Sequence, residues 1–133
     1  MSRLYMNHNE HSLPGRIAEG IITRGYWAKV GSTDSSKCLV ANTDDLCLGV
    51  VENTLAVGDN ATIFYEGAIV PVYVVSAFSA GQLGKVDSNG ATTVCTSDGD
   101  VARVQILYDA DALTYAVGKI MPPTYIGTLA DLH

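Results

Sequence analysis

The sequence has little basic charge, and its basic residues are not clustered. Of its 133 residues, 8 are Lys or Arg and 14 are Asp or Glu, which gives a formal net charge of −6. Proteins that bind nucleic acid neutralise phosphates with grouped Lys and Arg side chains. The composition therefore argues against a nucleic-acid partner.

Long apolar runs are also missing. No hydrophobic stretch reaches the roughly 20 residues that a membrane-spanning helix needs. No basic segment leads into an apolar stretch with a small-residue cleavage site, so we expect no membrane contact and a protein that stays where it is made. The hydrophobic fraction of 47% and the charged fraction of 17% predict one globular domain with tails.

Cysteine is scarce, and its spacing fits no known framework. Cys38, Cys47 and Cys95 are odd in number and too far apart for zinc-binding pairs. We expect buried free thiols. A disulfide between Cys38 and Cys47 across neighbouring strands, or a thiol on the surface, remains an alternative.

Catalytic motifs are missing as well. There is no GxSxG, Walker loop, helix-opening GxGxxG or HExxH, and a nucleophile activated by imidazole would have to recruit the N-terminal segment. There, His8 and His11 flank Glu10 in a weak metal-like cluster that lacks a framework to fix its ligands. "SDGD", residues 97–100, lacks the longer ligand series of a calcium loop. We predict no enzymatic activity, no metal and no cofactor.

Short β-rich segments are what the sequence does contain. Gly, Asn or Asp recurs every eight to twelve residues, and the segments between are rich in Val, Ile, Thr and Tyr. This pattern predicts an all-β sandwich or a small antiparallel barrel. The expected strands are 17–23, 25–31, 37–41, 46–53, 60–66, 68–75, 83–87, 91–96, 101–107 and 114–120.

Several turns have a recognisable chemistry, although no repeat occurs at a fixed period. Asn89-Gly90 predicts a type I′ hairpin, and Glu66-Gly67 predicts a looser one. "NTDDL", residues 42–46, predicts a short capped helical corner. Pro71 predicts a strand edge or a bulge, because proline cannot donate to a ladder.

The two ends differ from the body of the chain. Residues 1–16 are polar, contain a Pro-Gly break and show no period, so we expect an arm. The body is expected over residues 17–122, and Pro122-Pro123 should end the sheet and leave a tail over residues 123–133. Apolar residues in such segments suggest burial against another chain. In the arm these residues include Leu4, Tyr5 and Met6.

Aromatic residues give further interface candidates. Successive strand residues face opposite sides, so one ring of the pair Tyr26-Trp27 is expected to point outward. Tyr125 and its neighbour Ile126 in the tail are also candidates. The tyrosines Tyr65, Tyr73 and Tyr108 are expected to pack in the core or across strands.

The order of these segments resembles a known family. "GIITRGYWAKVG" is followed by "CLVANTDDLCLGVVENTLAVGDNATIFYEGAIVPVYVV", "FSAGQLGKVDSNGATTV" and "YAVGKIMPP". Over residues 17–122 this looks like the small capsid decoration, or cement, proteins of tailed bacteriophages. The segment "VARVQILYDADAL" and the cysteines depart from the pattern and leave the register of the closing strand in doubt.

The resemblance implies a fold, a location and a partner. It implies a β-tulip-like barrel that is made in the host cytoplasm, sits as a homotrimer on the outer surface of an icosahedral head and stabilises contacts between major capsid protein subunits. It also implies an N-terminal arm that binds the capsid protein, here through Leu4, Tyr5, Met6, His8 and Leu13.

Two other classes of function remain open. A receptor-binding or glycan-binding domain of a head fibre or tail tip would hold sugars on exposed Tyr and Trp. A biotinyl or lipoyl carrier would need a modifiable lysine at a hairpin tip, and Lys85 lacks the expected acidic or Met neighbours. Electron microscopy of the particle and a glycan array separate a capsid decoration protein from a glycan-binding domain.

Overall fold

The computed structural model describes residues 11–43 and 45–127. These residues form strands, turns and loops without a helix, which confirms the all-β prediction. Within these two ranges, no helix is therefore present that is long and apolar enough to cross a membrane.

The strands follow the predicted order along the chain. They are β1 (Ser12–Ala18), β2 (Trp27–Val30), β3 (Lys37–Val40), β4 (Cys47–Val51), β5 (Asn60–Phe64), β6 (Ile69–Val74), β7 (Leu83–Val86), β8 (Thr92–Val94), β9 (Val101–Ile106) and β10 (Thr114–Tyr125).

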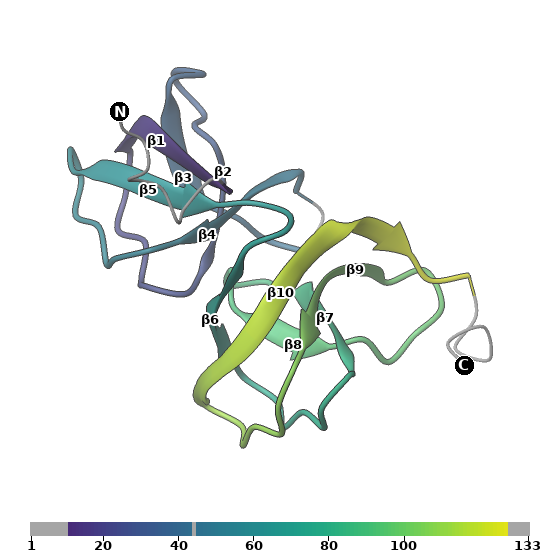
Figure 1. The fold of residues 1–133 in the computed structure, drawn as a ribbon. Coiled ribbons are helices and arrows are strands. Elements are labelled where there is room, and N and C mark those ends of the chain that lie inside the picture. The colour runs from purple at the N-terminus through teal and green to yellow at the C-terminus, as the bar shows by residue number, and fades with distance from the viewer. Residues whose placement is uncertain (1–10, 44, 128–133) are drawn as a thin grey trace.

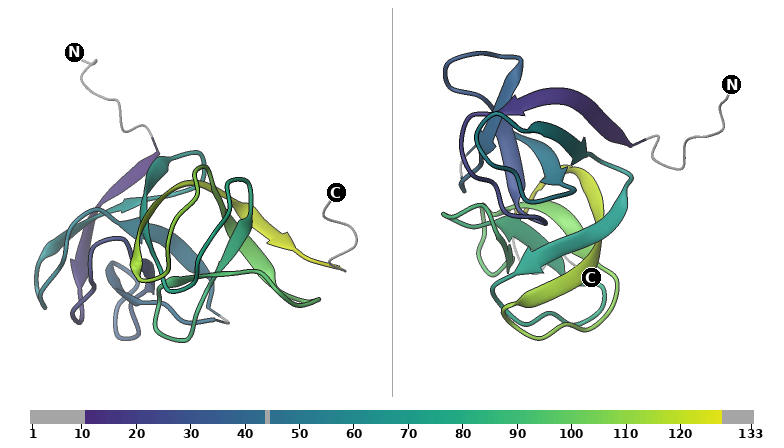
Figure 2. Two further views of the ribbon diagram at one scale, coloured as in Figure 1. Left: turned by 90° about the horizontal axis from the view of Figure 1, so that it is seen from below. Right: turned by 90° about the vertical axis from the view of Figure 1, so that its left-hand side faces the viewer.

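The strands close into two barrels that lie side by side. The first barrel has the order β1-β3-β2-β4-β5, and the second has the order β6-β8-β7-β9-β10. Both contain one parallel pair, β1 with β3 and β6 with β8, and their other pairs are antiparallel. In Figures 1 and 2, β6 leads from the first barrel into the second, and the long β10 curves over the second.

The second barrel repeats the backbone of the first. An isolated bridge joins Ile22 to Leu55 in one barrel and Phe78 to Ala110 in the other. The offset in residue number between equivalent residues is 56 at Ile22 and Phe78. Cys38 pairs with Val30 and Thr92 pairs with Val86, so Cys38 and Thr92 are also equivalent. Their offset is only 54, because the loops of the two barrels differ in length. This change explains why the sequence shows no repeat at a fixed period.

Equivalent side chains confirm the correspondence between the barrels. Lys29 forms an ion pair with Asp45 at 3.0 Å, and the equivalent Lys85 forms one with Asp100 at 2.8 Å. Each pair joins the second strand of its barrel to the turn that precedes the fourth strand.

A continuous apolar core crosses from one barrel into the other. Side chains on β6 alternate between buried and more exposed positions, as expected for a strand with one face inside a barrel. One cluster fills the first barrel and includes Ile22, Val51 and Ile63. The other combines residues of both barrels, among them Trp27, Phe64, Val72, Phe78, Val104 and Ile106.

Hydrogen bonds tie the two barrels together at a junction that includes both residues of the Tyr26-Trp27 pair. The Trp27 amide donates to the Gly90 carbonyl at 2.8 Å, and the Tyr73 amide donates to the Gly25 carbonyl at 3.1 Å. Inside the core, Trp27 Nε1 donates to Thr92 Oγ1 at 2.9 Å. Because the contacts are both polar and apolar, the barrels form one body.

The predicted first strand, residues 17–23, is wrong at both ends, since β1 stops at Ala18, and the last strand is wrong at its end. Proline accounts for the early start of β1 and for the late end of β10. β1 begins at Ser12 and not at residue 17, and the Pro14-Gly15 pair lies at a register shift between Leu13 and Arg16. β10 continues to Tyr125, and Pro122-Pro123 lies at a register shift between Ile120 and Thr124. A proline at such an irregularity has no ladder hydrogen bond to lose, so the strand continues past it.

Two turn predictions also need correction. β7 and β8 pair antiparallel around Asn89-Gly90, but only Gly90 has positive φ, so the turn is not type I′. The Asp87 carboxylate stabilises this loop instead, since its Oδ1 accepts from the amides of Asn89 and Ala91 at 2.8 and 3.0 Å. Glu66-Gly67 forms no hairpin, because β5 pairs with β1 and β4 whereas β6 pairs with β8 and β10.

The Pro71 prediction is confirmed. Pro71 faces Val117 of β10, and β8 meets β6 at Val74. One side of β6 therefore has no partner strand at the proline. Of the predicted corner at residues 42–46, Asp44 lies outside the described residues, and the Asp45 amide donates to the Asn42 carbonyl at 3.1 Å.

All three thiols are free. Cys38 is buried as predicted, and Cys47 and Cys95 are half-buried. Burial raises the pKa of Cys47 and of Cys95 to about 11. Cys38 and Cys47 are not on neighbouring strands, because β2 lies between β3 and β4.

Candidate interaction surfaces

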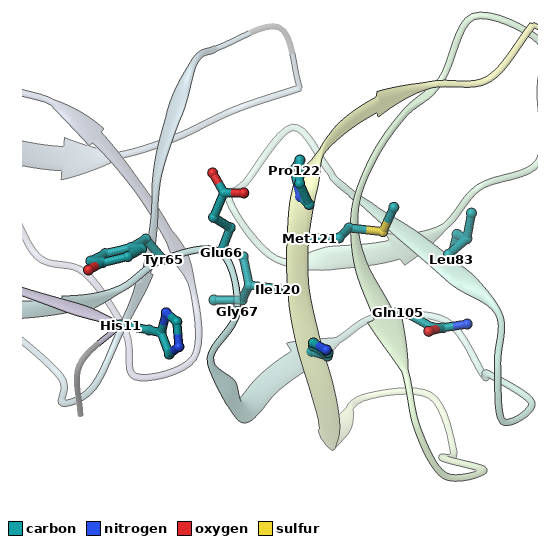
Figure 3. Close-up of a pocket in the computed structure, with 10 residues that line it drawn as sticks. His11, Tyr65, Glu66, Gly67, Leu83, Gln105, Ile120, Met121 and Pro122 are labelled. Carbon is teal, nitrogen blue, oxygen red and sulfur yellow. The ribbon is translucent and has the colours of Figure 1, made fainter. Parts of the chain in front are cut away.

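A groove of about 910 Å³ runs across the junction between the barrels. Its lining comes from the start of the first barrel, the β5–β6 connection and three strands of the second barrel. The residues that line it are His11, Tyr65, Glu66, Gly67, Leu83, Gln105, Lys119, Ile120, Met121 and Pro122 (Figure 3).

Backbone contacts fix one wall of the groove. The Tyr65 amide donates to the His11 carbonyl at 2.8 Å, and the Gly67 amide donates to the Ile120 carbonyl at 2.8 Å. A Cβ atom on Gly67 would lie 2.7 Å from His11 Cε1, so the absence of a side chain there makes room for the imidazole. The His11 and Tyr65 rings meet edge to face with centroids 5.9 Å apart.

The groove contains charged and polar groups suited to binding a ligand. Glu66 and Lys119 supply charges of opposite sign, and Gln105 Nε2 donates to the Gly81 carbonyl at 3.2 Å. No Ser, Thr or Cys is among the lining residues. Within residues 11–43 and 45–127, no group of three or more His, Cys, Asp or Glu is placed to hold a metal ion.

A cluster of tyrosines also lies at the junction. The Tyr26 and Tyr73 rings stack with centroids 5.5 Å apart, and Tyr73 meets Tyr115 edge to face at 5.4 Å. Tyr115 Oη donates to the Arg24 carbonyl at 2.9 Å, and the Arg24 guanidinium lies 5.0 Å from the centre of its ring. Burial raises the pKa of the Tyr26 hydroxyl. These rings hold the two barrels against each other.

The structure places the predicted interface residues in different environments. Tyr26 is half-buried in the tyrosine cluster, and Trp27 is buried, with 1% of its surface exposed. Tyr125 is 72% exposed, whereas its neighbour Ile126 is buried. The Ile126 amide donates to the Asp100 carbonyl at 2.8 Å, which holds this part of the chain on the second barrel.

The predicted capsid-binding arm is described only at its end. Leu13 is half-buried on β1, and His11, which was not among the predicted site residues, lines the groove. The other four predicted arm residues, Leu4, Tyr5, Met6 and His8, lie outside the described residues.

Sequence reasoning did not find the groove or the tyrosine cluster. Tyr73 and Tyr115 are 42 positions apart and face each other only because β6 and β10 pair in that register. Groove residues come from distant parts of the chain, and no short motif contains them. The tyrosine content of β6 and β10 was a signal, but it did not indicate a partner.

Comparison with known proteins gives a match among solved structures. No family model matches the chain, and no curated protein matches it. Among solved structures, the chain is similar to the crystal structure of the N base of head fibre gp8.5 of bacteriophage phi29, with a TM-score of 0.65. The match has 14% sequence identity and covers 85% of this chain and 95% of that chain. At this identity, the similarity shows a shared fold.

Proposed function

We propose that this protein is a structural component of a tailed-phage head and binds the outer surface of the capsid. The observation that supports this most directly is the fold shared with the base of a phage head fibre across 95% of that structure. The order of segments along the sequence, which resembles capsid decoration proteins, supports the same role independently.

The architecture suits adhesion. Its two barrels share one core and are joined by buried hydrogen bonds, so binding energy gained on one barrel is not lost to movement of the other. The proposed partner is the major capsid protein, and the proposed effect is stabilisation of contacts between its subunits. We propose a homotrimer on the head, because three linked copies raise apparent affinity by about 10² to 10⁴ when all can bind at once.

Binding to heads that lack this protein tests the role. Purified full-length protein should sediment with such heads in a saturable manner, and electron microscopy should show added density on their outer surface with three-fold symmetry. Heads that acquire no protein would contradict the role, and density with two-fold symmetry would contradict the homotrimer.

The arm can be tested in the same assay. Residues 1–10 precede β1 and include Leu4, Tyr5, Met6 and His8. Their removal should weaken attachment at least about tenfold, while thermal unfolding of the barrels stays within about 2 °C of the full chain. The substitution Leu13→Ala then tests the half-buried end of the arm. If the shortened chain coats heads as well as the full chain does, the arm is not the capsid contact.

Glycan binding by a head-fibre base is a second candidate function, and the groove favours it. A tyrosine ring beside a carboxylate, an amide and an ammonium group resembles the mixture of stacking and hydrogen bonding that saccharides need. A glycan array with the full chain should then give a hit that Tyr65→Ala abolishes, and Tyr108→Ala, outside the groove, should leave it unchanged. An array without hits excludes this candidate.

A further inference from the structure

Leu113 has a backbone conformation that leucine avoids. Its φ is +61°, and it is the one residue other than glycine with positive φ among residues 11–43 and 45–127. In this region the Cβ of an L-residue crowds its own backbone. The Leu113 side chain is nevertheless 66% exposed, so burial within this chain does not compensate for the strain.

The first barrel shows what the fold itself requires at this position. The equivalent residue is Gly58, whose φ is +91°. The Gly58 amide donates to the Ala18 carbonyl at 2.9 Å, and the Leu113 amide donates to the Val74 carbonyl at 2.8 Å. Glycine therefore satisfies the same turn without strain, and the presence of leucine needs another explanation.

The same loop carries a second exposed large side chain, Tyr108, five positions earlier in the sequence. The Arg24 amide donates to Thr54 Oγ1 at 3.0 Å in the first barrel, and the equivalent Ala80 amide donates to Asp109 Oδ1 at 2.8 Å in the second. Thr54 and Asp109 are therefore equivalent positions. Tyr108 is therefore equivalent to Asn53, and it is 67% exposed. We call residues 107–113 the β9–β10 tip. It lies at the lower end of the second barrel in Figure 1.

Exposure alone would not single out the β9–β10 tip. Scattered exposed apolar residues are normal on protein surfaces, and Val57 in the first barrel is 68% exposed. The tip differs because it presents Tyr108 and Leu113 where the other barrel has Asn and Gly, and because Leu113 keeps its side chain against backbone strain. Residues held in strained conformations of this kind cluster at functional sites.

The charges around the tip define the partner. Asp109 and Asp111 lie between Tyr108 and Leu113 in the sequence, and neither residues 107–113 nor the adjacent loop, residues 75–82, contains Lys or Arg. The chain as a whole carries a formal net charge of −6. A partner that accepts this surface needs an apolar pocket with a basic rim.

We infer that the β9–β10 tip is a docking element, with Tyr108 and Leu113 inserted into an apolar pocket of the major capsid protein and Lys or Arg on the rim of that pocket. This inference rests on the proposed function and adds to it the surface and the chemistry of contact. It also assigns to the second barrel a role that the first barrel, with Asn53 and Gly58, does not share.

The duplicated fold supplies the test variant. The double substitution Tyr108→Asn and Leu113→Gly gives the second barrel the residues that the first barrel has at the same positions. Attachment of the full-length variant to heads that lack this protein should weaken at least about tenfold. Its unfolding temperature should not fall, because glycine is unstrained in this conformation.

Two further variants act as controls. Val57→Asn removes an exposed apolar side chain from the first barrel and should leave attachment within about twofold of the unchanged chain. Asp111→Asn removes one charge from the tip and should reduce the loss of attachment that added salt causes, because salt screens exposed charge pairs.

The outcomes separate the two proposals. If the unchanged protein does not bind heads, the proposed function is wrong and so is the assignment of the tip as a docking element. If it binds and the double variant binds equally well, the function stands and the tip assignment is wrong. A lower mass of the free oligomer on light scattering in the double variant would show that the tip contacts a second copy of this chain, which also overturns the assignment. If the double variant does not fold, Leu113→Gly alone supplies the same comparison.

Discussion

Trp27 joins the two barrels through a buried hydrogen bond. Its indole Nε1 donates to Thr92 Oγ1 at 2.9 Å, and both residues are almost completely buried. A buried donor without an acceptor is costly, because it loses its bond to water and gains nothing. The buried Trp27 donor therefore depends on the Thr92 hydroxyl.

Replacing Thr92 with Val should lower the free energy of unfolding by roughly 1–3 kcal/mol, because it leaves the Trp27 donor unpaired at nearly constant volume. Urea denaturation followed by far-UV circular dichroism measures the change. Thr62→Val is the matched control, since Thr62 is half-buried on β5 and its equivalent in the second barrel is Val117. It should change stability by no more than about 0.5 kcal/mol. Equal losses in both variants would show that the buried hydrogen bond contributes nothing specific.

Glu19 organises the loop between β2 and β3. Its Oε1 accepts from the Ser32 amide at 2.8 Å and its Oε2 from the Thr33 amide at 3.0 Å, and both hydroxyls also donate to it. The Thr33 hydroxyl, followed by the two amides, lowers the pKa of Glu19 from 4.5 to about 2. These bonds favour the ionised form.

The lowered pKa predicts a pH dependence. A carboxyl group with a lower pKa in the folded state stabilises the fold above its unfolded pKa, and this stabilisation disappears as the pH falls through the folded value. Stability should therefore decline from pH 4.5 toward about 2, and Glu19→Gln should decline less over that range. Thermal melts at steps of pH measure this, with Glu66→Gln as the exposed control. Parallel curves for the unchanged protein and Glu19→Gln would refute the role of Glu19.

At the level of elements, the recurring turn residues and the β-rich segments between them predicted most strands to within a few residues. β5, β7 and β9 begin at their predicted positions, because Gly58-Asp59, Gly81 and Gly99-Asp100 mark the turns that precede them. The main errors are in β1 and β10, where Pro14-Gly15 and Pro122-Pro123 were taken as boundaries. Local residue type does not reveal a register shift, which depends on the partner strand.

Strand pairing and the groove were beyond the sequence for the same reason. The turn at Glu66-Gly67 has hairpin chemistry, yet it leads into a new barrel because β5 is already paired on both sides. Groove residues such as His11 and Gln105 meet only through that connection. Competition between distant partners decides such contacts, and a single sequence does not encode it in local patterns.

The loop between β7 and β8 depends on a side chain where a type I′ turn would depend on positive φ. Asp87→Ala should lower the free energy of unfolding by about 1 kcal/mol, because the amides of Asn89 and Ala91 lose their acceptor. Chemical denaturation measures this, with Ser88→Ala in the same loop as the control. An Asp87→Ala chain as stable as the Ser88→Ala chain would show that water replaces the carboxylate without cost.

At the scale of the molecule, the shared core predicts that the barrels unfold together. One apolar cluster includes Trp27 and Phe64 of the first barrel and Val72 and Val104 of the second, so separating the barrels exposes the interior of both. The sequence contains a single tryptophan, and it lies in this cluster. Tryptophan fluorescence therefore reports the junction, while far-UV circular dichroism reports all strands.

The two signals should change at the same denaturant concentration, and calorimetry should show one transition whose measured and van't Hoff enthalpies agree. The Thr92→Val chain provides the internal comparison, because it should move both signals equally. Fluorescence that changes before circular dichroism would show that the barrels separate before they unfold, and the single-body description would then be wrong.

The connection between the barrels also has a mechanical consequence. A flexible tether would let one barrel move relative to the other. Here the chain passes from β5 to β6 through a short turn, and the Gly67 amide in this turn donates a hydrogen bond to the Ile120 carbonyl. The hydrogen bonds of Trp27, Tyr73 and Tyr115 also join the first barrel to the second. A pulling force applied between Ser12 and Tyr125 would thus load several hydrogen bonds and the shared apolar core at once. The molecule would therefore transmit tension between these two residues with little extension, until the hydrogen bonds and the apolar core of the junction rupture together.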